Sequence, residues 1–339
     1  MTRHRPPGAG HDRDRVLHRV RLGRDHRGAR AQALDMDAVG ELEHAWHVVA
    51  DQDDRLASGA QVADELEHLP GLAHPEGRAD LPDHRDFLYS AIAKPSGKLP
   101  PNVDLRTKMP AIYDQGQLGS CTANAISGAF EFELLKQNAP DFMPSRLFIY
   151  YNERAIENTV NTDSGAQIRD GIKSVATQGV CPEAMWPYII SEFTQKPQSN
   201  CYEDALNHLV TSYHRLTQDV NQLKSCLAEG YPFVFGFTVY DSFESQQVAQ
   251  SGVLNLPAPG EKAIGGHAVM AVGYDDKSQR FIIRNSWGTD WGQQGYFTMP
   301  YAYLTNTNLA DDFWTIRLIM ANAALKKPAK KKQISKLQP

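Results

Sequence analysis

The stretch Gln115-Gly116-Gln117-Leu118-Gly119-Ser120-Cys121 is a turn-prone segment that ends in a single cysteine. Immediately after it, apolar side chains recur at spacings of three and four from Ala125 to Leu134, which predicts a helix that begins at Cys121. The unpaired N–H groups of a helix N-terminus favour negative charge, and the thiolate is the form of cysteine that attacks a carbonyl carbon. Cys121 is therefore the candidate nucleophile of the chain.

Length and composition limit the classes of protein to which the chain can belong. Its 339 residues, 41% of them hydrophobic, suffice for one or two packed domains. A net charge of −5 gives no overall attraction to nucleic acid, and no apolar run is long enough to cross a bilayer. No secretory signal is visible, so a cytoplasmic location is the default and secretion stays open. The four cysteines neither form a disulfide scaffold nor show metal-ligand spacing, so no metal site is expected.

The N-terminal quarter of the chain differs in composition from the rest. Residues 1–86 contain no Lys, Asn, Ile, Phe, Tyr or Cys, yet they hold nine of the twelve histidines. So little apolar bulk cannot offset the entropy of folding, and we expect low order in residues 1–80, with at most a marginal helix at Ala38–Val49. The histidines lack a recurring ligand spacing, which favours a solvated segment over metal binding. The missing amino acids have AT-rich codons. One hypothesis is therefore that this region corresponds to GC-rich DNA that is read in the wrong frame or lies upstream of the true start.

Ordinary composition begins near Leu81. Residues 81–102 are predicted to be an arm and a linker, and the apolar side chains of the arm could dock on the body or lie across the active site. Residues 103–320 form the predicted body. Residues 321–339 are rich in Lys and are predicted to be disordered, with polyanion binding as a weak alternative.

Periodicity divides the body into a mainly helical part and a strand-rich part. Helices are predicted at Ser145–Ile156, Ile168–Thr177 and Val220–Glu229, with Asp163-Ser164-Gly165 as a cap and turn before the second and Asp219 as the N-cap of the third. Strands are predicted at Val103–Arg106, Phe233–Tyr240, Ala268–Tyr274, Phe281–Arg284, Phe297–Pro300 and Phe313–Met320.

A histidine and an asparagine are placed together by one predicted hairpin. His267 opens the outgoing strand and Asn285 closes the returning one, with a turn at Asp276–Ser278 between them. Folding about this turn brings the two side chains level on neighbouring strands. An amide oxygen that accepts one ring N–H of a histidine fixes the tautomer and aims the other nitrogen outward. Such a pair needs a nucleophile, and Cys121 is the candidate with suitable electrostatics.

Three blocks together resemble the signature blocks of the papain-like cysteine peptidases. They are Gln115–Cys121, His267–Tyr274 and Asn285–Tyr296, in the order of that family. In the family, His and Asn follow the nucleophile by about 130–150 residues, close to the separations found here. The resemblance covers about residues 81–320. Because the family's long inhibitory pro-segment has no counterpart in residues 1–86, a bacterial branch is expected.

The resemblance implies both a fold and an activity. The expected fold is papain-like α+β, with a helical left domain at about 114–215, a β-barrel-like right domain at about 216–320 and the active-site cleft between them. The expected reaction is hydrolysis of peptide bonds through a thioester acyl-enzyme, for which no cofactor is needed.

The same resemblance assigns roles to individual residues. Cys121 would be the nucleophile, His267 its proton partner and Asn285 the residue that orients His267. Gln115 would donate its side-chain amide to the oxyanion, beside the backbone N–H of Cys121. Trp287 would shield the hydrogen bond between His and Asn from water.

The residues expected to bind substrate are Gly165, Gly266, Ala268 and Trp287. The neighbourhood of His267 has no carboxylate to pair with Arg or Lys, so the second subsite is expected to favour apolar side chains.

The sequence departs from the family pattern at several cysteine and aromatic positions. Leu118 replaces the cysteine that many members carry three residues before the nucleophile, so that disulfide cannot form. Thr122 replaces the usual aromatic residue after the nucleophile. Cys181 and Cys201 could pair or be free, and Cys226 is interpreted as a small buried hydrophobe.

Two other classes of function stay open on the sequence alone. A thiol-dependent amidase or transglutaminase-like acyltransferase would use the same triad on another amide, and would transfer acyl groups to amines or fail to cleave peptides. A non-catalytic binding protein with a blocked cleft would have no need of the intact Cys, His, Asn and Gln set. The expected partner is a peptide or protein substrate, with no nucleic acid and no membrane, and the chain is expected to be a monomer.

Overall fold

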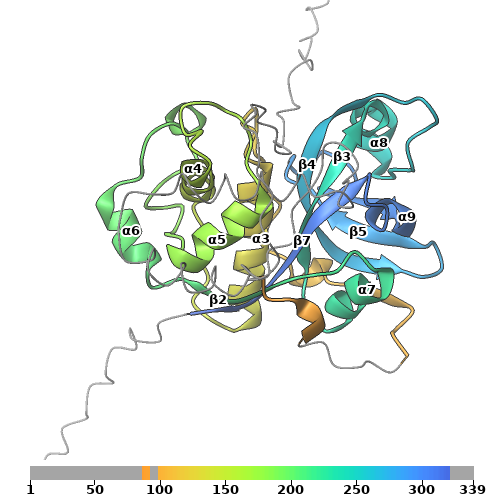
Figure 1. Ribbon diagram of the computed structural model, residues 1–339, viewed down its shortest axis with the longest axis horizontal. Coiled ribbons are helices and arrows are strands. Elements are labelled where there is room, and N and C mark those ends of the chain that lie inside the picture. Colours follow the sequence, from red (N-terminus) through yellow and green to blue (C-terminus); the bar gives the residue numbers. More distant parts are fainter. Residues whose placement is uncertain (1–85, 92–97, 321–339) are drawn as a thin grey trace, which may run out of the picture. The chain divides into compact units, whose positions relative to one another are not determined.

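Helix α3, Cys121–Lys136, is the element against which both parts of the fold pack. The computed structural model describes residues 86–91 and 98–320, all of which belong to one compact unit. Every residue of α3 from Cys121 to Leu134 is buried, because helices cover one side of it and a sheet covers the other (Figure 1). The predicted helix start at Cys121 is confirmed.

Three helices lie on one side of α3 in Figure 1. They are α4 (Arg146–Ile156), α5 (Ile168–Thr177) and α6 (Ser199–Ala205). The first two agree with the predicted helices to within one residue, whereas α6 lies in a stretch for which no helix was predicted. None of the helices in the described part of the chain is long and apolar enough to span a membrane.

Side chains cap the starts of two of the predicted helices. The hydroxyl of Ser145 accepts a backbone N–H from the first turn of α4. Asp219 caps α7 (Val220–Ala228) in the same way, as predicted. The predicted cap of α5 at Asp163-Ser164-Gly165 was wrong, because the N-cap is Gln167. Asp163 instead accepts hydrogen bonds from the backbone N–H of Gly119, in the loop before α3, and from the hydroxyl of Tyr150 in α4.

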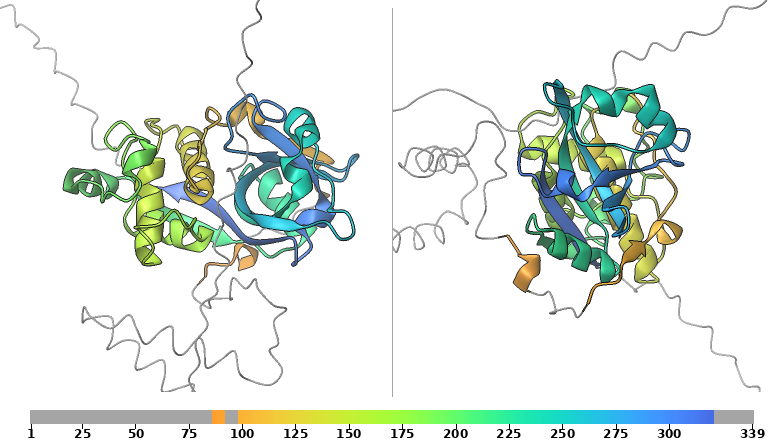
Figure 2. Two further views of the ribbon diagram at one scale, coloured as in Figure 1. Left: turned by 90° about the horizontal axis from the view of Figure 1, so that it is seen from above. Right: turned by 90° about the vertical axis from the view of Figure 1, so that its right-hand side faces the viewer.

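A sheet of seven antiparallel strands covers the other side of α3 in the described part of the chain. Its strands are β1 (Asn102–Asp104), β2 (Val210–Arg215), β3 (Phe233–Tyr240), β4 (Ala263–Asp275), β5 (Arg280–Arg284), β6 (Tyr296–Pro300) and β7 (Ala310–Ile319). The strand order is β2-β7-β3-β4-β5-β6, and β1 also pairs with β4. The short helices α8 (Gln246–Ser251) and α9 (Tyr301–Leu304) lie with α7 around the sheet (Figure 2).

The sheet is open, so the barrel-like description of the right domain was wrong. Among the described residues its end strands β2 and β6 do not pair with each other. The reason lies at the β2 end, where β2 and β7 pack against α5, and β7 also contacts α3. That end of the sheet is therefore covered by helices and does not curl round to meet β6. The predicted boundary between the left domain, about 114–215, and the right domain, about 216–320, remains a prediction.

Strands β4 and β5 form the predicted hairpin. The carboxylate of Asp275 accepts two backbone N–H groups of the turn, at 3.2 and 3.1 Å. The register pairs Met270 of β4 with Arg284 of β5. Asn285 therefore leaves the end of β5 close to the end of β4 that carries His267.

The described part of the N-terminal arm, residues 86–91, docks on the body. The backbone N–H of Arg215 in β2 donates to the carbonyl of Phe87 at 2.8 Å. Asp86 accepts a hydrogen bond from the guanidinium of Arg169 in α5 at 2.6 Å. Two strands, β7 and β3, separate β2 from β4. The arm was expected either to dock on the body or to lie across the active site, and residues 86–91 dock on the body. The predictions for residues 1–80 and 321–339 lie outside the described residues.

Replacement of Tyr89 tests how firmly this arm is anchored. Tyr89 is fully buried and its hydroxyl donates to Glu229 at 2.9 Å. Tyr89→Ala should lower the free energy of unfolding by about 3–5 kcal/mol, because it leaves a large cavity in a packed site. Urea denaturation measures the change. Phe87→Ala is the matched control, since that ring is 60% exposed, and a change within about 0.5 kcal/mol is expected for it. Equal losses in the two variants would contradict the anchoring role of Tyr89.

Candidate active site

Cys121 lies at the contact between helix and sheet. It is the first residue of α3, and the preceding Ser120 makes no side-chain cap hydrogen bond. The backbone N–H groups of Ala268, Thr122 and Cys121 itself act on the thiol and favour its ionised form. Ala268 belongs to β4 and follows His267 directly. The sulfur of Cys121 is therefore held beside the strand that carries the histidine.

The His267–Asn285 pair has the predicted geometry. Nε2 of His267 lies 2.8 Å from Oδ1 of Asn285. The backbone N–H of Ser286 donates to the same oxygen at 2.9 Å, which fixes the orientation of the amide. Because this oxygen accepts, Nε2 of neutral His267 carries the proton and Nδ1 is left as an acceptor. Nδ1 is thus the nitrogen that can take a proton from a nucleophile.

Aromatic side chains surround His267. The ring of Trp287 lies 5.0 Å from the imidazole, centroid to centroid, at an interplanar angle of 31°. Phe237 and Phe243 lie at 5.8 and 6.1 Å on the same measure. These rings keep water from the hydrogen bond to Asn285, which strengthens it. The shielding role proposed for Trp287 is consistent with this arrangement.

Burial opposes a lone charge on either member of the candidate pair. Burial raises the pKa of Cys121 to about 12 and outweighs the backbone N–H groups of the helix start. It lowers the pKa of His267 to about 4. A thiolate without an imidazolium, or the reverse, would be an unpaired buried charge. A charge on either side chain would therefore need a compensating charge beside it.

Gln115 is fixed between the loop before α3 and the end of β5. Its side-chain amide donates to the carbonyl of Leu118 at 3.0 Å, and its amide oxygen accepts from the hydroxyl of Ser286 at 2.6 Å. The backbone N–H of Gln115 also donates to Ser286, at 2.9 Å. A primary amide has two N–H donors, so one remains for a substrate oxygen. The structure therefore fixes Gln115 between Ser286, which follows Asn285, and the loop that leads to Cys121, and its contact with substrate remains a prediction.

The residues expected to bind substrate fall on both sides of Cys121. Gly165 has a φ of +70°, a backbone conformation that favours glycine. It lies two residues after Asp163, whose carboxylate accepts the backbone N–H of Gly119 at 3.0 Å. Gly266 lies opposite Thr238 of β3, one residue before His267. Their contacts with substrate remain predictions.

Glu153 is a buried acid behind Cys121 that the sequence analysis missed. It lies in α4 with no exposed surface, and the hydroxyl of Thr122 donates to its Oε1 at 2.5 Å. Its Oε2 has no hydrogen-bond partner among the described residues. Burial raises the pKa of Glu153 well above its ordinary value. The only sequence signal was a carboxylate on the apolar face of a predicted helix.

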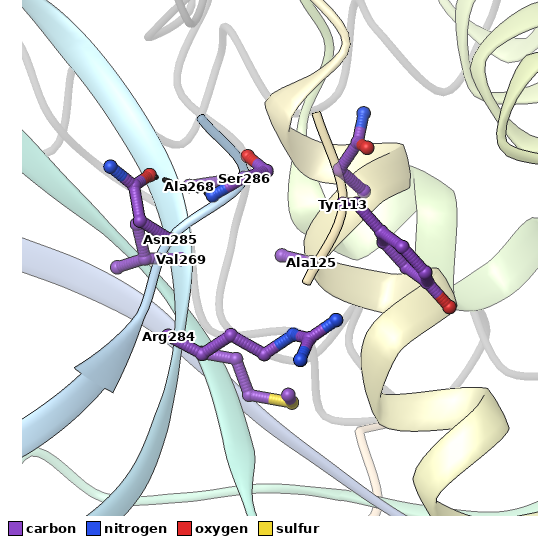
Figure 3. A pocket seen from close by; sticks show the side chains of 9 residues that line it. Tyr113, Ala125, Ala268, Val269, Arg284, Asn285 and Ser286 are labelled. Atoms are coloured by element: carbon purple, nitrogen blue, oxygen red, sulfur yellow. Dashed lines mark hydrogen bonds between the residues drawn. The ribbon is translucent and has the colours of Figure 1, made fainter. Parts of the chain in front are cut away.

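A small cavity lies between α3 and the strands β4 and β5 (Figure 3). Its lining includes Tyr113, Ala125, Ala268, Val269, Arg284, Asn285 and Ser286. The guanidinium carbon of Arg284 lies 5.0 Å from the ring centroid of Tyr113. The cavity thus belongs to the contact of helix and sheet beside the candidate active site.

Cys181, Cys201 and Cys226 are buried free thiols, so the structure shows the unpaired alternative for the first two. Among the described residues no group of His, Cys, Asp and Glu could hold a metal ion.

The chain resembles known proteins over most of its described part. Residues 99–314 match the family described as papain family cysteine protease. A peptidase C1-like protein of Acanthamoeba polyphaga mimivirus is 50% identical over 213 residues, which cover 60% of this chain and 68% of that protein. Cathepsin K of Gallus gallus is 29% identical over 236 residues, which cover 67% of this chain and 65% of that protein. The chain thus spans about two thirds of the length of these relatives.

Solved structures show the same fold. Xylellain, a cysteine protease from Xylella fastidiosa, aligns with a TM-score of 0.64 and 50% identity over 70% of this chain and 93% of its own. Digestive procathepsin L 3 of Tenebrio molitor aligns with a TM-score of 0.53 and 22% identity, over 66% of this chain and 72% of its own, and shows a likeness of fold alone. The predicted papain-like α+β fold is confirmed, and the expected bacterial branch agrees with the Xylella protein.

Glu153→Gln should remove a pH-dependent loss of stability. The raised pKa means that folding retains a proton which the unfolded chain releases above about pH 4.3. The stability from this group is therefore complete below that pH and declines as the pH rises toward the raised pKa. Glutamine keeps the acceptor for Thr122 but cannot ionise. The melting temperature of the variant relative to the native chain should rise between about pH 5 and 8.

The control for this measurement is Glu203→Gln, on the exposed surface of α6. Its melting temperature should follow that of the native chain at every pH. A Glu153→Gln curve parallel to the native one would mean that Glu153 is ionised in the folded protein.

Proposed function

The chain belongs to the papain family of cysteine proteases, which are hydrolases, and on this premise we propose that it hydrolyses peptide bonds with Cys121 as nucleophile. The observation that carries the proposal is the hydrogen bond of 2.8 Å between Nε2 of His267 and Oδ1 of Asn285. That bond leaves Nδ1 of His267 as the acceptor for the proton of a thiol held at the start of α3.

The reaction begins with proton transfer from Cys121 to Nδ1 of His267. The thiolate attacks the carbonyl carbon of the scissile peptide bond, and the carbonyl electron pair moves to oxygen. As the intermediate collapses, the C–N bond breaks and the imidazolium gives its proton to the leaving amine, which leaves a thioester on Cys121. Water then attacks the thioester with His267 as base, and the thiol leaves with the proton. Asn285 keeps the imidazole in one orientation throughout.

The oxyanion is the second element of the proposed mechanism. Its stabilisation comes from the side-chain amide of Gln115 and the backbone N–H of Cys121 at the start of α3. Such donors accelerate the reaction because they are already aimed at the position where negative charge develops. The contacts of Gln115 with Leu118 and Ser286 support this preorganisation.

The proposed substrates are peptides or proteins with an apolar side chain at the second subsite. The strand before the histidine brings only glycine at positions 265 and 266, and a Cβ placed on Gly265 would meet no atom within 4 Å. Open space without a carboxylate suits Leu, Val or Phe better than Arg.

The proposal is tested by incubating the purified full chain with a peptide library and mapping cleavage sites by mass spectrometry. Cleavage should be abolished by an epoxysuccinyl thiol inhibitor and by Cys121→Ser, and an apolar residue should precede the cleaved residue. A parallel reaction with excess amine distinguishes an acyltransferase, which would give amide products in place of acids. No turnover in either reaction, with intact folding, would leave the binding-protein alternative.

Alkylation should single out Cys121 and should depend on His267. In the native chain iodoacetamide at pH 5.5 should label Cys121 well before Cys181 or Cys226, because proton transfer to the histidine supplies a thiolate at that pH. In His267→Ala the thiol titrates alone, and burial raises its pKa to about 12. Labelling at pH 5.5 should then nearly cease. Faster labelling of another cysteine, or labelling unaffected by the substitution, would contradict the assignment.

Gln115→Ala should lower kcat by roughly 10²–10³, with KM little changed, because the lost donor acts mainly on the transition state. The matched control is Gln117→Ala, which removes the same side chain from an exposed position two residues away. Its kcat should equal that of the native chain. A similar kcat for both variants would remove Gln115 from the mechanism.

A further inference from the structure

Arg146 is a buried cation at an unfavourable position. It is the first residue of α4 and only 6% exposed. The N-terminus of a helix carries partial positive charge, so a cation there is disfavoured unless other groups compensate. A strong set of partners must therefore hold it.

Glu183 supplies the compensating charge. Its two carboxylate oxygens accept from Nε and Nη2 of Arg146 at 2.9 and 2.8 Å, which is the two-pronged geometry of a strong guanidinium–carboxylate pair. This interaction neutralises the cation and fixes the plane of the guanidinium. It leaves Nη1 to face other parts of the chain.

Nη1 of Arg146 donates to the loop that precedes Cys121. It lies 3.0 Å from the carbonyl oxygen of Asp114, the residue before Gln115, and 3.2 Å from Oδ1 of Asn124 in α3. One guanidinium thus ties the first residue of α4 to both the start of this loop and the first turns of α3.

Tyr188 extends the same contact to the other end of the loop. Its ring centroid lies 3.9 Å from the guanidinium carbon of Arg146. Its hydroxyl donates to the carbonyl of Gln115 at 3.0 Å and lies 2.5 Å from the hydroxyl of Ser120, the residue before Cys121. Arg146 and Tyr188 together therefore contact the loop next to both Gln115 and Cys121.

We propose that Arg146, paired with Glu183 and stacked on Tyr188, is a positioning residue for acyl transfer that fixes the amide of Gln115 relative to Cys121. The proposal rests on the proposed function, because it assigns Gln115 to the oxyanion. The guanidinium of Arg146 is bonded to Glu183, Asp114 and Asn124, so it acts through the loop and the first turn of α3.

The expected signature is a loss of kcat without a matching change in KM. A small displacement of a positioned group can reduce the rate by about 10², so Arg146→Lys and Tyr188→Phe should each lower kcat by about 10- to 100-fold. Lysine keeps the charge but cannot bind Glu183 and Asp114 at once. Phenylalanine keeps the stacked ring and removes only the hydroxyl, so this variant has the smaller effect on folding.

Arg280→Lys is the matched control. The guanidinium of Arg280 also donates to backbone carbonyls, those of Leu254 and Thr298, and this residue lies at the opposite end of β5 from Asn285. The control should lower the melting temperature and leave kcat close to the native value.

A double-mutant cycle with Gln115→Ala decides whether Arg146 acts through Gln115. If it does, Arg146→Lys should lower kcat little further once Gln115→Ala is present. Losses that multiply in the double variant, a loss confined to KM, or an equal loss of kcat in Arg280→Lys would overturn the proposal.

Amide hydrogen exchange provides a readout that does not depend on proteolysis. Exchange in peptides covering residues 114–120 should be faster in Arg146→Lys and Tyr188→Phe, and unchanged in Arg280→Lys. Unchanged exchange in the first two variants would overturn the positioning role. If the native chain cleaves no peptide although Arg146 restrains this loop, the proposed function fails separately from the positioning role of Arg146.

Discussion

The most demanding constraint on this molecule is that a charge on Cys121 or on His267 would be a buried charge. Both side chains are cut off from water, and burial alone drives each toward its neutral form. Everything that favours charge separation must therefore come from fixed groups. The amides at the start of α3 and at Ala268 stabilise the thiolate, and the oxygen of Asn285 stabilises the imidazolium. Rigid placement of helix and sheet is accordingly a chemical requirement as well as a structural one.

The loop before Cys121 shows how that rigidity is achieved. On the sheet side, the backbone N–H groups of Gln115 and Gly288 donate to Ser286 and Tyr113 respectively, so the loop is hydrogen-bonded to the segment that follows Asn285. On the helix side it is held by the guanidinium of Arg146. The loop is thus fixed to both parts of the fold, and its geometry depends on the distance between them.

Sequence reasoning succeeded where the determining contacts are local. Three features depend on only a few neighbouring residues: the helix start at Cys121, the cap at Asp219 and the hairpin that sets His267 level with Asn285. Hydrophobic periodicity or a turn sequence predicts each of them directly. The order of the three family blocks added the fold. Sequence reasoning failed where a structural feature depends on contacts between residues that are far apart in the chain. The open sheet follows from pairing of β2 with β7 and from the helices that cover them, which no local pattern encodes.

The same reasoning explains the missed residues. Arg146 and Glu153 are charged residues within a helical pattern, where charge normally marks the solvent face. Glu183 elsewhere in the chain compensates the charge of Arg146, whereas burial itself favours the neutral form of Glu153. A single sequence contains no sign of such partners.

The position of β7 within the sheet has a consequence for the order in which the protein can form. β7 is the last described strand in sequence, yet it lies between β2 and β3. The hairpins β3–β4 and β4–β5 can form from contacts between strands that are close in the chain, but β2 must wait for β7 before it has a strand partner in the sheet. Closing so long a loop is slow compared with forming hairpins. A chain still on the ribosome and ending before Ala310 would also lack the contacts of β7 with α3. Synthesis itself therefore delays completion of the sheet, which has to wait for the residues of β7.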